Sequence, residues 1–487
     1  MSPNNVQGGC SALFTDFYSL TMAQGYWKNK MDKRAVFEMF FRRHPFGGGF
    51  SVFAGLETLV EKIGGFSFSR GDLEYLASLG VFEDAFLDYL AGFRFSGDLW
   101  SLDEGTIVFP QEPLIRVDAN LIESQIIEGL ILNTINFQSL VATKTARVWL
   151  ASGQGSIMEF GLRRAQGEDG AMSASRASFI GGASGTSNVL AGKKFRIPVL
   201  GTMAHSWVMS FPSEEEAFRA YADLYPGKTI FLIDTYDSLR SGVQNAIRAG
   251  KTLAEKGENF GVRLDSGDIH YLSLEVRKAL DAAGFPNATI TVSNDLDEAI
   301  IETLTRGGAP IDTWGVGTQM VTGGNEAAFS GVYKLAASEE QGRLRPRIKF
   351  SDNPEKTTNP GVKQLWRIRD GDGMAVADIL ALDDPANPDI LEKNRRYVFW
   401  HPQADYRHFY HTIEGSAEPL LRIRISGGTA LSSPPPLAEI QRGVREGLDR
   451  FDQSYKRILN PHIYKVSVTE RLRTLKLDLI KNYLGEL

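Results

Sequence analysis

The stretch TIFLIDTYDSLRSGVQNAIRAGKTLAEKGENFGVRLD, residues 229–265, has an apolar run at each end and a helix-like segment between them. The runs at 229–234 and 261–265 are short and continuous, which is typical of strands buried on both faces of a parallel sheet. The segment 239–256 between them is long enough for the crossover helix that parallel strands require. This stretch therefore predicts a β-α-β unit and an α/β fold.

The same rhythm of apolar runs and helix-like segments continues on both sides of this unit. Helix-like segments lie at 213–224, 271–283 and 296–306, and Ser213 followed by three glutamates is a typical helix start. Seven or eight buried strands favour a closed β/α barrel, and an open, doubly wound sheet is the alternative. The expected strands are 156–160, 177–180, 198–202, 229–234, 261–265, 288–293 and 313–317, with 332–335 as an eighth.

The two ends of the chain differ from this central pattern. In the first part we expect strands and helices mixed in an α+β layer, and after about residue 340 we expect hairpins. The sequence thus divides into an N-terminal lobe at 1–135, a barrel at 136–340 and a C-terminal segment at 341–487. Expected elements of the ends are strands 36–41 and 50–53, helices 73–78, 82–93 and 438–451, a hairpin of 105–110 with 113–117, and hairpin strands 344–352, 361–369 and 374–380.

Composition excludes several classes of protein. The 53 Lys and Arg residues against 59 Asp and Glu residues give a net charge of −6. The chain therefore lacks the excess of basic residues that would indicate nucleic-acid binding. One cysteine excludes a disulfide framework and a cysteine metal cluster. The first twenty residues lack the basic and apolar regions of a secretory signal, and the longest apolar region, 121–140, is interrupted by polar residues. We expect a cytoplasmic protein in which 121–140 is a buried core helix.

Glycine is in excess, with 49 residues, about 10% against a usual ~7%. Nine of them fall between Gly153 and Gly192, and five between Gly315 and Gly331. Both clusters follow or bridge expected barrel strands. We therefore interpret them as tight turns that expose backbone N–H groups to phosphate.

Side chains that suit phosphate binding end or follow several of these strands. Because the carboxyl ends of parallel strands share one edge, the loops after them converge on one mouth. Arginine pairs phosphate oxygens, and carboxylates hold Mg²⁺ beside phosphates. Each residue alone also has a structural explanation, such as a turn or a surface ion pair, so the prediction depends on their convergence. The residues are Arg163, Arg164, His205, Asp234, Asp237, Arg263, Asp265, Asp268, Asn294, Asp295, Thr318, Gly323 and Gly324.

Specific strings resemble the nicotinate phosphoribosyltransferase family and follow that family's order. They include GTMAHSW at 201–207 and VRLDSGDI at 262–269, which together are highly specific, and also TDFYSLTMAQGYW at 15–27, MEFGLRRAQG at 158–167, VSNDLDE at 292–298 and GVGTQMVTG at 315–323. The resemblance implies a type II phosphoribosyltransferase fold, an irregular α/β barrel with a lobe built from both chain ends. It also implies a homodimer with active sites at the subunit interface.

The implied reaction joins nicotinate to 5-phosphoribosyl-1-diphosphate and releases nicotinate mononucleotide and pyrophosphate. It is coupled to ATP hydrolysis, with Mg²⁺ on the phosphates, and it begins NAD salvage from the free acid. A neutral imidazole can attack the γ-phosphate of ATP, so the resemblance makes His205 the phosphorylated histidine.

The resemblance also implies the substrate contacts. Arg263 would pair the nicotinate carboxylate, and Thr202 and Tyr18 would line the nicotinate pocket, with Tyr18 from the neighbouring subunit. Arg163 would contact pyrophosphate, and Asp265 the ribose hydroxyls or Mg²⁺. The ribose 5-phosphate would bind Gly317, Thr318, Gly323 and Gly324.

Other functions stay open at this point. The nearest alternative is a nicotinamide-using enzyme of the same fold, and a decarboxylating relative that uses quinolinate is a second. A sugar-phosphate aldolase would need a lysine at a strand end, and Lys193 and Lys194 precede a strand instead. A non-catalytic metabolite sensor would lack the key histidine or arginine, and both are present.

Overall fold

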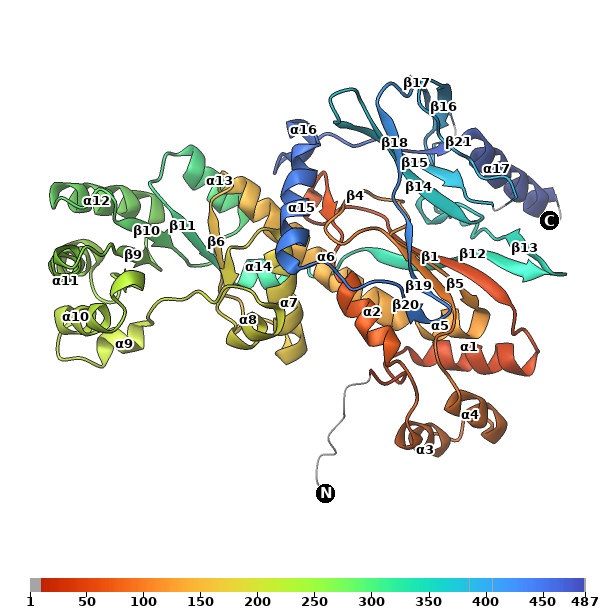
Figure 1. The fold of residues 1–487 in the computed structure, drawn as a ribbon, viewed down its shortest axis with the longest axis horizontal. Coiled ribbons are helices and arrows are strands. Elements are labelled where there is room, and N and C mark those ends of the chain that lie inside the picture. Colours follow the sequence, from red (N-terminus) through yellow and green to blue (C-terminus); the bar gives the residue numbers. More distant parts are fainter. Residues whose placement is uncertain (1–9, 385, 405, 486–487) are drawn as a thin grey trace. The chain divides into compact units, whose positions relative to one another are not determined.

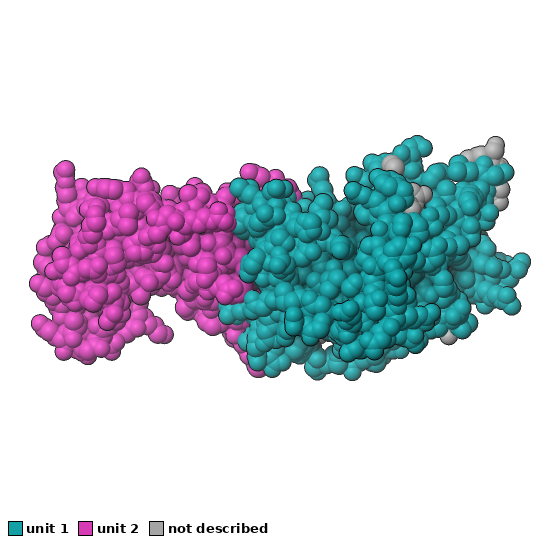
Figure 2. All heavy atoms as spheres, turned by 90° about the horizontal axis from the view of Figure 1, so that it is seen from above, with its two compact units in different colours: residues 1–139, 328–487 teal, residues 140–327 magenta. Residues whose placement is uncertain are grey.

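The computed structural model describes residues 10–384, 386–404 and 406–485. Residues 1–9, on which part of the signal-peptide prediction rests, lie outside this set. The chain divides into two compact units (Figure 2). Unit 1 comprises residues 1–139 and 328–487, and unit 2 comprises residues 140–327.

Unit 2 is built on a six-stranded sheet with the order β7-β6-β11-β10-β9-β8 (Figure 1). Every neighbouring pair in this sheet is parallel. Side chains of its central strands, such as Val262, Ile290 and Val316, are completely buried, as the continuous apolar runs predict. The strands are β6 Ser156–Glu159, β7 Gly185–Thr186, β8 Ile230–Leu232, β9 Gly261–Leu264, β10 Thr289–Val292 and β11 Thr313–Val316.

The prediction of an α/β fold is confirmed, but the closed barrel is not seen. Among the described residues β7 and β8 are the two edges of the sheet. The segment 198–202 is not a full strand, because its pairing with β7 consists of a single bridge between Val199 and Thr186. Residues 177–180 belong to a helix, α7 (Gly167–Gly181), and 332–335 belong to a strand of unit 1.

Helices alternate with the parallel strands of unit 2, as expected. Ser213 caps α10 by accepting a hydrogen bond from the backbone of Glu216, and Asp268 and Asp297 cap α12 and α13. A short π-helix, Ser238–Gly242, precedes α11. The remaining helices are α8 Val189–Phe195, α9 His205–Met209, α10 Glu214–Leu224, α11 Val243–Glu255, α12 Ile269–Ala282, α13 Glu298–Arg306 and α14 Thr318–Thr322.

The first sheet of unit 1 combines strands from both ends of the chain, which confirms the predicted composite lobe. Its order is β13-β12-β1-β5-β3-β19-β20, and β1 pairs antiparallel with β12 on one side and β5 on the other. The strands are β1 Arg34–Phe41, β3 Asp98–Ser101, β5 Ile115–Asn120, β12 Gly331–Glu340, β13 Arg343–Pro346, β19 Arg422–Ser426 and β20 Thr429–Ala430.

A second sheet of unit 1 has the order β17-β16-β21-β15-β14-β18. The predicted hairpin is present, because β14 and β15 pair antiparallel around a turn at Asp370. The predicted pairing of 105–110 with 113–117 is wrong, because β4 (Ile107–Val108) pairs with β2 (Ser51–Val52) instead. The strands of the second sheet are β14 Lys363–Arg369, β15 Ala375–Leu382, β16 Arg396–Trp400, β17 His408–Thr412, β18 Ser416–Pro419 and β21 Val466–Thr469.

Residues 121–151 form the longest helical stretch of the described chain. By length and composition alone this stretch could cross a membrane, but 72% of its most apolar window is buried in the protein. This burial agrees with the predicted core helix. The stretch consists of α5 Leu121–Ile126 and α6 Glu128–Ala151, and α6 continues from unit 1 into unit 2 after residue 139. The other helices of unit 1 are α1 Phe17–Lys28, α2 Leu56–Gly64, α3 Arg70–Ser78, α4 Asp84–Ala91, α15 Leu437–Asp449, α16 Gln453–Lys456 and α17 Glu470–Gly485.

Unit 1 contains a buried cluster of ionisable groups. Arg367 forms an ion pair with Asp378 at 2.6 Å, and the Tyr464 hydroxyl donates to Asp378 at 3.0 Å. Burial, followed by the charge of Asp378, raises the pKa of Glu112 well above its usual value. The Glu112 carboxyl therefore holds its proton to a higher pH than a free glutamate does, and that proton suits a hydrogen bond to Asp378.

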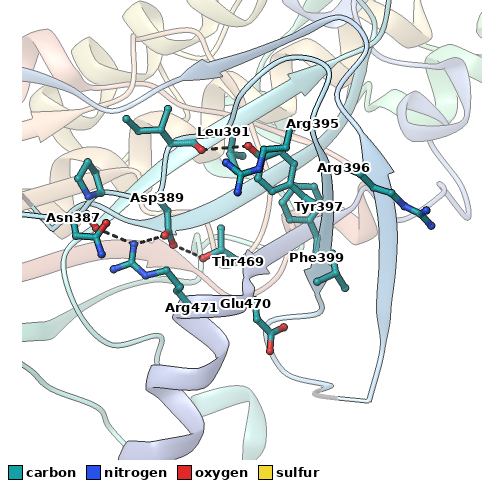
Figure 3. A pocket seen from close by; sticks show the side chains of 13 residues that line it. Asn387, Asp389, Leu391, Arg395, Arg396, Tyr397, Phe399, Thr469, Glu470 and Arg471 are labelled. Carbon is teal, nitrogen blue, oxygen red and sulfur yellow. Dashed lines mark hydrogen bonds and ion pairs between the residues drawn. The ribbon is translucent and has the colours of Figure 1, made fainter.

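A hollow of about 490 Å³ lies beside the second sheet of unit 1 (Figure 3). It is lined by the segment 387–399 and by the start of α17. Arg471 donates to Asp389 at 2.5 Å, and Thr469 donates to the other oxygen of the same carboxylate at 2.7 Å. Arg395 pairs with Glu392 at 3.2 Å. The charges at this hollow are largely compensated by neighbouring protein groups.

Candidate active site

A pocket of about 410 Å³ lies at the carboxyl ends of the parallel strands of unit 2. This is the edge at which open and closed parallel sheets bind their ligands. Nine of the residues predicted from the sequence line it: Arg163, Arg164, Thr202, Arg263, Asp265, Asn294, Asp295, Gly317 and Thr318. The other lining residues are Phe160, Leu162, Ser187, Gly201, Met203, Ala204, Ser293 and Gly315.

Arg263, on β9, is held by side chains from neighbouring segments. Its Nε donates to the Ser293 hydroxyl at 2.9 Å, and its Nη1 donates to the Thr202 hydroxyl at 2.8 Å and to the Met203 carbonyl at 3.4 Å. Its Nη2 donates to Asp265 at 2.8 Å. Four of the five guanidinium N–H groups are thus engaged, and one remains for a ligand. The guanidinium is fixed in place before substrate arrives.

Asp265 connects this arginine to the predicted catalytic histidine. Burial acts to raise its pKa, but the charge of Arg263 and hydrogen bonds from Ser293 and Arg263 outweigh burial, with a smaller contribution from His205. The net result is a pKa below the ordinary value, so Asp265 is ionised at neutral pH. The carboxylate therefore has a fixed negative charge in the pocket wall.

His205 begins α9, next to the pocket. Its Nε2 lies 3.7 Å from Asp265 Oδ2, and its Nδ1 lies 3.1 Å from the Thr235 hydroxyl. The side chain is 40% exposed, so a ligand can reach it. An accessible imidazole beside an ionised carboxylate suits nucleophilic attack, because the carboxylate stabilises the positive charge that develops on the ring.

Asp234, two residues after the end of β8, supports the loop that carries Asp265. Its Oδ2 accepts hydrogen bonds from the Asp265 backbone at 3.1 Å and from the Ser266 hydroxyl at 2.6 Å. The neighbouring candidates Asp237 and Asp268 have a structural role, because the side chain of each caps a helix. The polar residues that follow strands therefore include both candidate site residues and helix caps.

Arg163 and Arg164 lie exposed in the loop after β6. Among the residues that the structure describes, neither guanidinium makes a hydrogen bond or an ion pair. Gly317 and Thr318 line the same pocket and lie at the start of α14. Two unpaired guanidinium groups near backbone N–H groups suit a ligand with several phosphate charges.

Gly323 and Gly324 do not line the pocket. They follow α14 with left-handed backbone, at φ of 76° and 57°. A Cβ on Gly323 would lie 2.6 Å from the Glu326 carbonyl, and one on Gly324 would lie 2.1 Å from the Gln319 side chain. The structure therefore explains both glycines by the tight end of the helix.

Tyr18 belongs to α1 of unit 1 and is 47% exposed. Burial, followed by the charge of Glu128, raises its pKa, so the ring carries a neutral hydroxyl. Its predicted contact with nicotinate involves a second subunit, and it stays a prediction.

Among the pocket residues that were not predicted from the sequence, two have side chains that contact Arg263. Ser293 bridges Arg263 and Asp265, and the Phe160 ring lies under the Arg263 guanidinium, 5.5 Å from it. Each residue directly follows a strand, β6 for Phe160 and β10 for Ser293, where charged candidates were also found. A search that included hydroxyl and aromatic residues at strand ends would have found them.

Known proteins similar to this chain agree with one another. Models of the nicotinate phosphoribosyltransferase family match along most of its length: the N-terminal domain at residues 13–136, the family itself at 156–368 and the C-terminal domain at 362–476. The chain is 43% identical over 467 residues to a nicotinate phosphoribosyltransferase of Bacillus subtilis, covering 94% of this chain and 93% of that protein.

Human proteins and solved structures give the same result. The human nicotinate phosphoribosyltransferase is 34% identical over 522 residues, and the match covers 95% of each chain. The crystal structure of human nicotinic acid phosphoribosyltransferase superposes with a TM-score of 0.84 at 32% identity, covering 96% of this chain and 99% of that one. A nicotinate-nucleotide pyrophosphorylase from Pyrococcus furiosus shares the fold, with a TM-score of 0.70 at 21% identity. The chain therefore belongs to the nicotinate phosphoribosyltransferase family.

Proposed function

We propose that the chain transfers the phosphoribosyl group of 5-phosphoribosyl-1-diphosphate to nicotinate, giving nicotinate mononucleotide and pyrophosphate. The observation that carries this proposal is the pocket at the strand ends, where a fixed arginine and two unpaired arginines face one space of about 410 Å³. Membership of the family supports the reaction, and this geometry supports the assignment of its substrates to the pocket.

Arg263 is the proposed partner of the nicotinate carboxylate. Ser293 and Thr202 from two neighbouring segments, together with Asp265 just after the same strand, hold its guanidinium, and its last N–H group is available to a carboxylate oxygen. Thr202, which accepts from the same guanidinium, would form the edge of this subsite. Such an anchor favours the acid over the amide, because a charged hydrogen bond to a carboxylate is stronger than one to a neutral carbonyl.

Arg163 and Arg164 are the proposed partners of the diphosphate, and Gly317 and Thr318 of the 5-phosphate. The transition state of this transfer resembles an oxocarbenium ion, so the departing pyrophosphate must be neutralised as its charge develops. The pyridine nitrogen supplies its own lone pair, and the step needs no general base. Asp265 is the proposed contact of the ribose hydroxyls.

Mg²⁺ enters the proposal with the substrate. Among the described residues no group of three His, Cys, Asp or Glu side chains could hold a metal ion. Mg²⁺ is commonly bound through substrate phosphates, water and one or two carboxylates, without a dedicated protein cage. Mg²⁺ is therefore the proposed counterion of the diphosphate, and no proposed step depends on a metal held by the protein.

ATP is the proposed co-substrate, with His205 as the residue that it phosphorylates. A lone pair of the imidazole attacks the γ-phosphorus, the bond to the ADP oxygen breaks, and ADP leaves with that electron pair. The ionised Asp265 beside Nε2 stabilises the cationic ring. Later hydrolysis of the phosphohistidine to phosphate would couple ATP energy to product formation.

The proposed assembly is a cytoplasmic homodimer in which Tyr18 of one subunit completes the nicotinate pocket of the other. Tyr18 is half-exposed on α1, as an interface residue of a free subunit would be. Its ring could then stack on the pyridine.

A transfer assay tests this proposal. Purified protein receives phosphoribosyl diphosphate and either nicotinate or nicotinamide, with and without ATP, and mononucleotide is measured. We expect faster turnover of nicotinate and stimulation by ATP, and faster turnover of nicotinamide would contradict the assignment. His205→Ala should abolish labelling of the protein by γ-³²P-ATP and leave weak ATP-independent transfer. His270→Ala, on α12 outside the pocket, is the matched control and should keep its labelling.

A further inference from the structure

A buried carboxylate lies beneath the pocket and is not part of the catalytic groups described above. Glu159 ends β6 and is only 1% exposed. One carboxylate oxygen accepts from the Gly161 backbone N–H, and the other accepts from the Ser175 hydroxyl at 3.0 Å and from the Thr186 hydroxyl. All three donors are neutral. A buried carboxylate surrounded in this way depends on its hydrogen bonds, so these bonds restrain the groups that make them.

The donors come from three segments, and two of these continue directly into the pocket wall. Gly161 opens the loop that carries Arg163 and Arg164, and Thr186 precedes Ser187, which lines the pocket. Ser175 lies on α7. One side chain therefore connects the arginine loop after β6, the helix that follows it and the loop after β7.

Further hydrogen bonds extend this network around Thr186. The Thr186 hydroxyl accepts from the Asn188 backbone at 2.9 Å, and the Asn188 side-chain amide donates to the Ser175 hydroxyl at 3.3 Å. The Ser187 backbone N–H donates to the Glu159 carbonyl at 2.9 Å. Each of these bonds restrains the loop after β7 relative to β6.

The arginine loop also has little room to move at its start. A Cβ placed on Gly161 would lie 2.1 Å from the Val321 side chain and 2.8 Å from Glu159. The Gly161 backbone is thus pressed between α14 and the buried carboxylate. A change at Glu159 would reach the loop directly.

We propose that Glu159 is a positioning residue for the anion site: it holds the loops at 161–164 and 186–188 so that Arg163 and Arg164 face the diphosphate. The proposal rests on the proposed function for the identity of the substrate. It predicts that Glu159 and its donors control the affinity for diphosphate without touching it.

The experiment compares hydroxyl deletions at matched buried sites. Thr186→Val and Ser175→Ala remove donors to Glu159, and Glu159→Gln changes the acceptor. Ser178→Ala is the control, because Ser178 lies on the same helix as Ser175, is fully buried and makes no hydrogen bond to Glu159. For each variant we measure the KM for phosphoribosyl diphosphate, the KM for nicotinate, kcat, the Kd for inorganic pyrophosphate and the melting temperature.

We expect Thr186→Val and Glu159→Gln to raise the KM for phosphoribosyl diphosphate and the Kd for pyrophosphate about tenfold or more, with the KM for nicotinate changed much less. Thr186→Ser should restore both values. Ser178→Ala should leave all constants unchanged. Variants that lose thermal stability but bind pyrophosphate as Ser178→Ala does would overturn the proposal, and so would a parent protein that binds no pyrophosphate. If the parent binds pyrophosphate but transfers nothing to nicotinate, the proposed function fails and the positioning role stands.

Discussion

Two pockets of the described chain, one in each unit, have similar volumes and formal charge. The pocket at the strand ends of unit 2 measures about 410 Å³, and the hollow in unit 1 measures about 490 Å³. Each is lined by three arginines and two carboxylates: Arg163, Arg164, Arg263, Asp265 and Asp295 in unit 2, and Arg395, Arg396, Arg471, Asp389 and Glu470 in unit 1. Neither volume nor net charge therefore distinguishes a ligand site from a structural hollow.

The pockets differ in how their charges are paired. In unit 1, Arg471 and Arg395 have carboxylate partners, and Arg396 lies over the Tyr410 ring at 5.1 Å. In unit 2, Arg263 has Asp265, but neither Arg163 nor Arg164 has a hydrogen-bonding or ionic partner in the described chain. Positive charge that the protein leaves uncompensated is available to an anion. The pairing of the charges, and not their number, therefore distinguishes the two pockets.

The largest expected effect comes from deleting the unpaired charges. Arg163→Ala combined with Arg164→Ala should lower kcat/KM for phosphoribosyl diphosphate by about 100-fold or more, because the departing pyrophosphate loses its neutralising groups. Steady-state assays at varied phosphoribosyl diphosphate measure this effect. Arg395→Ala, the same change in the other pocket, should alter activity less than twofold. Equal losses in both pockets would break the comparison.

A smaller effect is expected on the free energy of unfolding when arginines of the unit 1 hollow are replaced. Arg471→Ala leaves the mostly buried Asp389 without its ionic partner, so the free energy of unfolding should fall by about 1–3 kcal/mol. Arg395→Ala removes an exposed pair and should cost about 0.5 kcal/mol or less. Urea titration of both variants measures the difference. Catalytic constants at saturating substrate should remain those of the parent, and a kinetic defect in Arg471→Ala would assign the unit 1 hollow a role in the reaction.

The smallest effect concerns the pH dependence of stability. Glu112 has a raised pKa in the folded protein, so the folded state retains a proton that the unfolded state releases above about pH 4.5. Its contribution is therefore fully present below the unfolded pKa and decreases as pH rises toward the folded pKa, with a slope of at most about 1.4 kcal/mol per pH unit. Glu112→Gln should flatten this slope above about pH 4.5. Unfolding by urea at several pH values tests the prediction, and an unchanged slope would show that Glu112 is ionised.

Local signals explain most of what could be predicted about the fold. The stretch 229–265 forms β8, α11 and β9 as expected, because apolar continuity and helix length are properties of neighbouring residues. The run 177–180 was assigned to a strand because four apolar or small residues do not distinguish a strand from the end of a helix. Closure of a barrel depends on pairing between distant segments, and no local pattern reports it.

The site shows the same division between local patterns and contacts of distant segments. Arg263, Asp265 and Thr202 were predicted, and the structure brings them together by hydrogen bonds. Glu159 was not predicted, because its burial and its three donors come from segments that meet only in the folded chain. The proposed contact of Tyr18 with nicotinate needs a second subunit, and no pattern within one chain reports such a contact.

The insertion of unit 2 between the two parts of unit 1 has a consequence for synthesis on the ribosome. β1 pairs with β5 soon after both are made, but its other partner, β12, follows the roughly 190 residues of unit 2. At about 5–20 residues per second, this delay lasts on the order of 10–40 s. Unit 2 is continuous and can fold within that time, while β1 presents an unpaired strand edge. The growing chain is thus most prone to edge-to-edge association before residue 340 emerges.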